Sequence, residues 1–180
     1  MPTFLEFTRD SQQVAAGIVV NDQLSGPVIE QNKAAYMAQF VAKQEFQNIY
    51  NSLNNQQYVD KLFENTGIAA SAAEKAALVA GLSSGTETRA TVLQKVVDGI
   101  QVIAESNIVV IASYGQQFAN KEFNGGFVAM EYFGYLRRNG DTPGYIHWLN
   151  KMNFYGNFID AEMVRAFLIS PEYRSRFGGP

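Results

Sequence analysis

The chain has 180 residues, of which 47% are hydrophobic and 13% aromatic, a composition typical of a globular protein and not of a disordered one. Its 17 acidic and 14 basic residues are spread without runs and give a net charge of −3, so the sequence lacks the basic surface expected of a nucleic-acid-binding protein. Cysteine is absent, which excludes disulfides, thiolate metal sites and cysteine nucleophiles.

The first residues do not form a secretory signal, because Glu6, Arg9 and Asp10 interrupt the stretch where an apolar core would be required. The longest apolar run, Ile108–Ala112, is too short to cross a bilayer, so we expect no insertion into a membrane. Helical residues begin at Thr3 without a flexible lead. We therefore expect the chain to be part of a longer polypeptide.

Helical periodicity dominates the first half of the chain. Residues 30–50 keep their apolar side chains on one face of a helix, after an early loop marked by residues 22–26 and Pro27. Residues 86–105 show the same periodicity and are predicted as a second long helix. The apolar stripe of this helix consists of Val92, Val96, Ile100 and Ile103.

Strand propensity is concentrated at two places. Residues 18–20 and 107–111 are rich in β-branched side chains, which favour strands. Residues 107–111 have no similar run to pair with and are flanked by helical patterns. We therefore interpret them as the continuation of a buried helix.

Caps and breaks divide the remaining helices. Ser71 and Glu74 have the spacing of a capping box, in which each side chain bonds the other residue's backbone amide. The run Asn124-Gly125-Gly126 predicts a break between two helical units. After a second turn, Thr142 is predicted to cap a helix, with the proline that follows it at the first helical position.

The middle and last thirds of the chain repeat each other at an offset of roughly seventy residues, the length of a helical supersecondary array. Each copy contains an aromatic helix, a capped second helix that ends in a glycine, and a third helix with an apolar stripe. A shorter echo relates residues 40–46 to residues 167–173. The corresponding positions are Tyr58-Val59 with Phe127-Val128, Leu78-Val79 with Trp148-Leu149, Gly85 with Gly156, and Val92, Leu93, Val96 and Val97 with Met163, Val164, Phe167 and Leu168.

From these patterns we predict an all-α protein, a compact multi-helix bundle built from two related helical units. Residues 1–54 are N-terminal helices, which we interpret as the tail of an earlier unit. Residues 55–123 form the first helical repeat, and residues 124–180 form the second. No proline-rich linker separates the repeats, so we expect them to pack as one body.

Motifs in the last third of the chain resemble the family of domain of unknown function 4214. They are Glu131-Tyr132-Phe133-Gly134-Tyr135-Leu136-Arg137-Arg138, the run from Gly144 to Asn153 around Trp148, and the run from Ser170 to Gly178. The resemblance is dense there and looser across the middle repeat. It implies an all-α module, distantly similar to phycobilisome linker domains, of the kind found near the C-terminus of large exported or surface-attached bacterial proteins. It implies an extracellular or cell-surface location and no known reaction.

A catalytic hypothesis rests on residues 81–85, which match the Gly-x-Ser-x-Gly nucleophile elbow at Ser83. His147 lies downstream, with Asp98 or Asp141 between them. The elbow requires a strand that delivers the serine onto a sharp turn, whereas a helical pattern precedes Ser83. We therefore interpret this segment as a helix C-terminus with its glycine cap. We predict no catalytic residues and no enzyme, and a serine hydrolase is the least favoured alternative.

Metal and anion sites are not predicted either. His147 is the only histidine, and one histidine without cysteine does not make a transition-metal site unless several carboxylates converge on it. Asp141 stands alone where similar family members carry several aspartates, and it supplies only the start of a calcium loop. Asn124-Gly125-Gly126 lacks the lysine and serine of a phosphate-binding loop. We predict no metal and no cofactor.

Aromatic and arginine side chains of the second repeat are the best candidates for a binding surface, because flat rings with polar tips bury area at little cost in rotamer entropy. Most of these rings are predicted to pack in the core. The candidate surface consists of Tyr135, Arg137, Arg138, Tyr145, His147 and Tyr155. We expect a non-enzymatic interaction or assembly module of a secreted or surface-attached bacterial protein, which binds protein or a surface glycan. The alternative is a purely structural or oligomerising module without a ligand.

Overall fold

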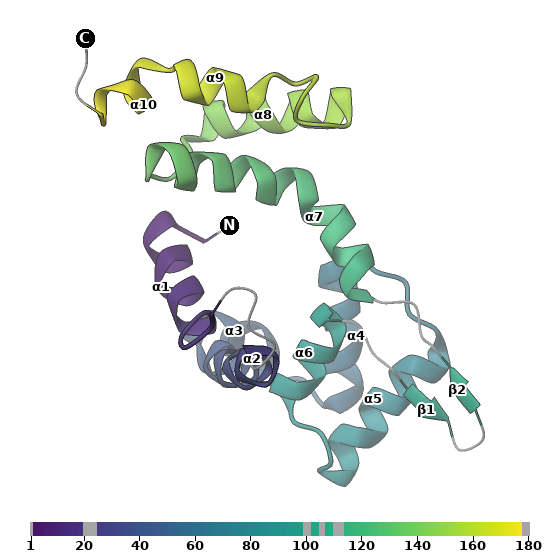
Figure 1. Ribbon diagram of the computed structural model, residues 1–180. Coiled ribbons are helices and arrows are strands. Elements are labelled where there is room, and N and C mark those ends of the chain that lie inside the picture. Colours follow the sequence, from purple (N-terminus) through teal and green to yellow (C-terminus); the bar gives the residue numbers. More distant parts are fainter. Residues whose placement is uncertain (1, 20–24, 99–101, 105–106, 110–113, 178–180) are drawn as a thin grey trace. The chain divides into compact units, whose positions relative to one another are not determined.

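The computed structural model describes residues 2–19, 25–98, 102–104, 107–109 and 114–177, with side chains described in the same ranges apart from residues 102–119 (Figure 1). Most of these residues are helical, which confirms the predicted all-α fold class. Two short strands, β1 (Val102–Ala104) and β2 (Asn107–Val109), pair antiparallel. The helices are α1 (Phe4–Val14), α2 (Ser25–Ala42), α3 (Gln44–Tyr50), α4 (Asn55–Thr66), α5 (Ala72–Ser84), α6 (Arg89–Asp98), α7 (Tyr114–Glu131), the π-helical segment η1 (Tyr132–Leu136), α8 (Thr142–Tyr155), α9 (Met163–Ile169) and α10 (Pro171–Ser175).

The chain divides into two compact units. Unit 1 comprises residues 1–9 and 121–180, and unit 2 comprises residues 10–120. This division places α2 and α3 in the same unit as α4, α5 and α6, whereas the sequence analysis separated residues 1–54 from residues 55–123. The packing of the predicted repeats as one body stays a prediction.

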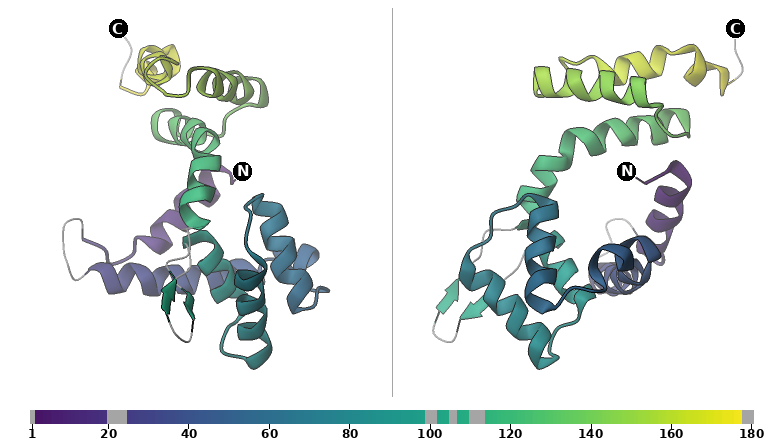
Figure 2. Two further views of the ribbon diagram at one scale, coloured as in Figure 1. Left: turned by 90° about the vertical axis from the view of Figure 1, so that its right-hand side faces the viewer. Right: turned by 180° about the vertical axis from the view of Figure 1, so that it is seen from behind.

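The core of unit 2 is built around α4. This helix buries Tyr58, Val59, Leu62 and Phe63 against residues of α3, α5 and α6. α2 lies against α6, and α4 lies against α5 (Figure 2). The ring of Tyr58 is fully buried, and its hydroxyl donates to the backbone oxygen of Arg89 at 2.7 Å. This bond satisfies the polar tip that a buried tyrosine brings into a core.

The helix ends of unit 2 follow the predicted chemistry. Ser71 caps α5, and both bonds of the predicted capping box with Glu74 are present. Gly85 ends the same helix in the left-handed conformation with φ 76°, as a glycine cap requires. α4 has a second capping box between Asn54 and Gln57.

The core of unit 1 is built around the end of α7 and η1. Val128, Ala129, Tyr132 and Phe133 are buried there against α8 and α9, whose contributions include Met152 and Phe167. α1 belongs to this core as well, because the rings of Phe4 and Phe7 lie 5.8 and 5.2 Å from the ring of Phe133. Phe133 and Met152 are buried members of this cluster, and Leu136, Trp148 and Leu149 are partly buried against it.

The buried positions of the two units follow the same spacing. In unit 2, α4 buries residues at i, i+1, i+4 and i+5, namely Tyr58, Val59, Leu62 and Phe63; in unit 1, the end of α7 with η1 buries Val128, Ala129, Tyr132 and Phe133 at the same spacing. Each segment ends at a left-handed residue, Gly67 after α4 and Arg137 after η1.

The predicted break at Asn124-Gly125-Gly126 is wrong, because α7 continues through these residues. The reason lies in the packing of α7 on α8. The hydroxyl of Tyr145 donates to the backbone oxygen of Gly125 at 3.2 Å, and a Cβ at Gly125 would lie 2.9 Å from this hydroxyl. Glycine therefore permits a close approach of the two helices, which outweighs its low helix propensity.

The predicted helix over residues 30–50 is divided in two. α2 ends at Ala42 and α3 begins at Gln44, because Lys43 has an extended backbone with φ −62° and ψ 142°. α2 also starts earlier than predicted, at Ser25. Pro27 therefore lies in its first turn, where a missing amide hydrogen breaks no helical bond. The predicted loop residues 22–24 lie outside the described part of the chain.

The predicted helix over residues 86–105 is too long, since α6 covers only Arg89–Asp98. Ile103 belongs to β1 and pairs with Ile108 of β2, so the predicted continuation of a helix through residues 107–111 is also wrong. Val102 and Ile103 are the β-branched residues that pair with β2, although helical periodicity predicts Ile103 in the preceding helix. Ile100, Val110 and Ile111 lie outside the described residues, as does Val20 of the other strand candidate, whose Ile18 and Val19 are not in a strand.

The cap of α8 is Asp141 and not Thr142, which is the first helical residue. The Asp141 carboxylate accepts from the backbone amide of Gly144 at 2.9 Å. This hydrogen bond is the main reason that the pKa of Asp141 is lowered. An ionised carboxylate suits this position better than a hydroxyl, because the helix dipole favours negative charge at the N-terminus.

Candidate functional site

Arg138 is held within unit 1. Its Nε donates to Oε1 of Glu172 at 2.6 Å, and its Nη2 donates to Oε2 at 2.9 Å. Its guanidinium also lies over the ring of Tyr132, 5.3 Å from the centroid. The hydrogen bonds from Arg138 lower the pKa of the Glu172 carboxyl. This bidentate pair joins the turn after η1 to α10, and a further donor of Arg138, Nη1, bonds the backbone oxygen of Asn139 at 2.8 Å.

Tyr135 and Tyr145 are half-buried and serve the core of unit 1. The ring of Tyr135 lies 5.4 Å from that of Tyr173 and 6.3 Å from that of Phe167. The backbone oxygen of Tyr135 accepts a hydrogen bond from Arg176. The hydroxyl of Tyr145 donates to the backbone oxygen of Gly125 in α7. Burial raises the pKa of both phenols.

The other three candidate residues are exposed. Arg137 ends η1 in the left-handed conformation with φ 53°. His147 lies on α8 with its ring 5.1 Å from that of Trp148. Tyr155 is the last residue of α8 and contacts Phe154. The structure thus joins Tyr135 and Arg138 to the core and leaves Arg137, His147 and Tyr155 on the surface; their role in binding stays a prediction.

The most conspicuous exposed side chains of unit 1 were missed by the sequence analysis. Phe154 is 82% exposed and Ile159 is 70% exposed, on either side of Gly156. Nearby, the ring of Phe127 lies 5.0 Å from that of Phe158 and 6.0 Å from that of Phe123. We name this group the apolar loop surface; it consists of Phe123, Phe127, Phe154, Tyr155, Phe158 and Ile159.

A hydrogen bond joins the two helices that carry Phe123 and Phe154, because Nδ2 of Asn124 in α7 donates to Oδ1 of Asn153 in α8 at 2.9 Å. One feature of the sequence indicates this surface: bulky apolar residues flank the Gly156-Asn157 turn on both sides.

Ser83 lies at the C-terminal end of a helix and not in a nucleophile elbow. It lies in the last turn of α5, after helical residues and before the left-handed Gly85. Its Oγ accepts from Nδ2 of Asn55 at 3.2 Å. Ser83 belongs to unit 2, whereas His147 belongs to unit 1. The strand that a nucleophile elbow requires does not precede this serine.

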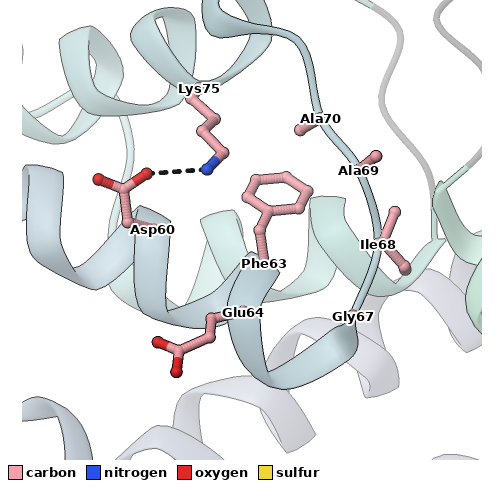
Figure 3. Close-up of a pocket in the computed structure, with 8 residues that line it drawn as sticks. All are labelled: Asp60, Phe63, Glu64, Gly67, Ile68, Ala69, Ala70 and Lys75. Atoms are coloured by element: carbon pink, nitrogen blue, oxygen red, sulfur yellow. Dashed lines mark hydrogen bonds and ion pairs between the residues drawn. The ribbon is translucent and has the colours of Figure 1, made fainter.

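A hollow of about 420 Å³ lies in unit 2, between the end of α4 and the start of α5 (Figure 3). Phe63, Ile68, Ala69 and Ala70 give it an apolar wall. At its side, Nζ of Lys75 lies 2.9 Å from Oδ1 of Asp60. Hydrogen bonds from Gln56 and then Lys75 lower the pKa of Asp60. Its lining residues, Asp60, Phe63, Glu64, Gly67, Ile68, Ala69, Ala70 and Lys75, include no serine or histidine.

Glu131 is a buried carboxyl in unit 1. It is 8% exposed, and its Oε2 has no hydrogen-bond partner within the part of the chain that the structure describes. Burial raises its pKa to about 7. An ionised carboxylate here would carry its charge in a poorly solvated place. Glu131 therefore bears on the stability of unit 1.

Within the described residues, no three histidine, cysteine, aspartate or glutamate side chains gather as a metal site would require. In the same part of the chain, every helix falls short of the length and hydropathy needed to span a membrane.

A family model matches residues 37–101, which run from α2 to the end of α6; its description is "Domain of unknown function (DUF4214)". The match confirms the family that the sequence analysis named. It lies in unit 2, whereas the resemblance was densest in the last third of the chain. No curated protein and no solved structure matches the chain.

Proposed function

Residues 37–101 belong to the family of domain of unknown function DUF4214, and from this premise we propose that the chain is a non-enzymatic interaction module that binds a protein partner through the apolar loop surface of unit 1. The observation that carries the proposal is the exposure of Phe154 and Ile159. Large exposed apolar patches are uncommon on monomeric proteins and mark interaction sites, so the proposal requires these side chains to form one patch.

The proposal moves the contact surface away from the residues favoured by sequence alone. Arg138 and Tyr145 are engaged within unit 1, so neither is free to act as the centre of a binding site. In the apolar loop surface, Phe127 packs against the core of unit 1, whereas Phe154 is largely exposed and contacts the ring of Tyr155. Burial of such rings dominates the energetics of many protein interfaces.

The setting on a secreted or surface-attached bacterial protein, which the resemblance implies, belongs to this proposal.

Glycan binding is a second candidate, favoured by the exposure of His147, Asn150 and Tyr155, which all lie on α8. A purely structural module without a ligand is the third. The double variant Phe154→Ser, Ile159→Ser tests the proposal when it is compared with the native chain for binding of anilinonaphthalene sulfonate and on a glycan array. We expect the dye signal to fall severalfold without a change in the thermal midpoint, and no glycan to bind.

Two results would count against the proposal. A glycan hit that Tyr155→Ala abolishes would favour the second candidate. An unchanged dye signal would show that Phe154 and Ile159 do not form an accessible apolar surface, which would favour a purely structural module.

A further inference from the structure

The sequence contains two Asn-Gly pairs, Asn124-Gly125 and Asn139-Gly140. In such a pair the backbone nitrogen of the glycine can attack Cγ of the asparagine, because glycine has no Cβ to obstruct the approach and its backbone rearranges easily. The attack closes a cyclic imide and needs no enzyme. Whether a folded chain permits it depends on the backbone at each pair.

The two pairs lie in different backbone settings. Gly125 lies within α7, where its amide takes part in the helical hydrogen bonding. The side chain of Asn124 is also held, because its Nδ2 donates to Oδ1 of Asn153 at 2.9 Å. Asn139 and Gly140 instead lie in the irregular turn between η1 and α8, and Asn139 is exposed. Within the residues that the structure describes, the Gly140 amide donates no backbone hydrogen bond, so its nitrogen is available for the attack.

Packing accounts for the glycine in this turn. A Cβ at Gly140 would lie 3.1 Å from both Cδ2 and Cε2 of Tyr132, which is buried in the core of unit 1. A larger residue would slow the ring closure, but it would also crowd the ring of Tyr132. The turn therefore keeps a glycine after Asn139 for its packing, and the reactivity of the pair comes with it.

The Asn139 side chain also has a donor at the atom where charge develops in the reaction. Its Oδ1 accepts from the backbone amide of Phe4 at 2.6 Å. When a nitrogen attacks Cγ, negative charge develops on this oxygen, and a donor already placed there stabilises it. Phe4 is the first residue of α1, so the positive end of the helix dipole acts in the same direction.

We propose that Asn139 is a site of spontaneous deamidation, whereas Asn124 is protected by its helix. The Gly140 nitrogen forms a bond to Cγ of Asn139, and the side-chain amino group leaves with the amide hydrogen of Gly140 as ammonia. Water then adds to one of the imide carbonyls and breaks the bond from that carbon to nitrogen. Opening at Cγ leaves aspartate. Opening at the backbone carbon leaves isoaspartate, in which the chain runs through the former side chain.

The two products differ in their effect on α1. The amide of Phe4 is one of those that a helix start leaves without a helical partner, and Asn139 supplies its acceptor from 135 positions further along the chain. Aspartate keeps an acceptor there and adds a charge that suits a helix N-terminus. Isoaspartate adds a carbon to the backbone between η1 and α8 and displaces the acceptor. The bond that water breaks therefore decides whether α1 keeps this cap.

Ageing of the full chain at mildly alkaline pH, followed by mass spectrometry of tryptic peptides, tests the proposal. Cleavage after arginine and lysine places the two Asn-Gly pairs in separate peptides. The peptide with Asn139 is expected to show the mass change of an amide-to-acid conversion severalfold faster than the peptide with Asn124. In the chain unfolded by urea both are expected to react at similar rates, because the protecting helix is then absent. An unreactive Asn139, equal rates in the folded chain, or the same difference in the unfolded chain would overturn the proposal.

Asn139→Asp reproduces one product and tests the effect on α1. Its thermal midpoint is expected to stay close to that of the native chain, because a carboxylate oxygen replaces the amide oxygen as the acceptor for Phe4. Asn139→Ala lacks an acceptor and is expected to melt at a lower temperature. A midpoint for Asn139→Asp as low as that of Asn139→Ala would contradict the retained cap.

Discussion

The hydroxyl of Tyr145 donates to the backbone oxygen of Gly125 across the contact between α7 and α8, at 3.2 Å. A Cβ on Gly125 would lie 2.9 Å from that hydroxyl, whereas a Cβ on Gly126 would meet nothing within 4 Å. The two neighbouring glycines of one helix therefore have different reasons to be glycine. One permits a close helix contact, and the other is free of contacts.

The first prediction compares alanine at these two positions. Gly126→Ala is expected to raise the free energy of unfolding by about 0.5–1 kcal/mol, because alanine costs less backbone entropy in a helix. Gly125→Ala is expected to lose this gain and to be less stable than Gly126→Ala by about 1 kcal/mol or more, because the ring of Tyr145 must shift. Urea titration followed by the fluorescence of Trp148, the only tryptophan, measures both values.

Tyr145→Phe provides the control for that comparison. When Tyr145 is phenylalanine, the hydroxyl that obstructs the new methyl group is absent. The difference in unfolding free energy between the two alanine variants is therefore expected to shrink. A gap that persists unchanged would mean that Tyr145 is not the reason for the glycine.

The second prediction concerns pH. Burial raises the pKa of Glu131 in the folded chain to about 7 from an ordinary value of 4.5, so the folded state holds a proton that the unfolded state has released between these values. Stability supplied by this group is therefore present at acid pH and falls as pH rises toward 7. The loss amounts to roughly 3 kcal/mol.

Glu131→Gln tests this dependence, because an amide keeps the size of the neutral acid and does not titrate. The difference in unfolding free energy between the variant and the native chain is expected to grow in favour of the variant from pH 4.5 to 8. Glu162→Gln serves as the control, since Glu162 is exposed. A difference that is constant over this range would show that the Glu131 carboxyl does not titrate differently on folding.

The third prediction uses the end of η1. Arg137 adopts φ 53° at the position where α4 ends in Gly67 with φ 62°, and this left-handed region is costly for a residue with a Cβ. Arg137→Gly is expected to raise the free energy of unfolding by about 1 kcal/mol or somewhat less. Arg137→Ala controls for the lost charge and is expected to leave stability nearly unchanged. Equal gains for both variants would refute the backbone explanation.

Local chemistry made part of this fold predictable from sequence. Ser71 with Glu74, and the closing glycines Gly85 and Gly156, act as predicted because each signal depends on residues within one turn. The family was also recognisable, although the matched model covers residues 37–101 and the densest resemblance lay beyond them.

The wrong predictions share a different cause. Gly125 looked like a break because its partner, Tyr145, lies on another helix, and no local pattern reveals such a contact. Ile103 fitted a helical stripe, yet it pairs with Ile108 in a hairpin. Periodicity gives the face of a helix and not what covers that face, so it did not reveal that the Tyr145 hydroxyl bonds Gly125.

The apolar loop surface is the central claim, and the free energy of unfolding of the double variant Phe154→Ser, Ile159→Ser tests it most directly. Met152→Ala, at a fully buried position of the same unit, sets the scale, with an expected loss of about 2–5 kcal/mol. The account predicts that the double variant stays within about 0.5 kcal/mol of the native chain, as exposed positions do. A loss comparable to that of Met152→Ala would contradict it, because Phe154 and Ile159 would then be part of the core.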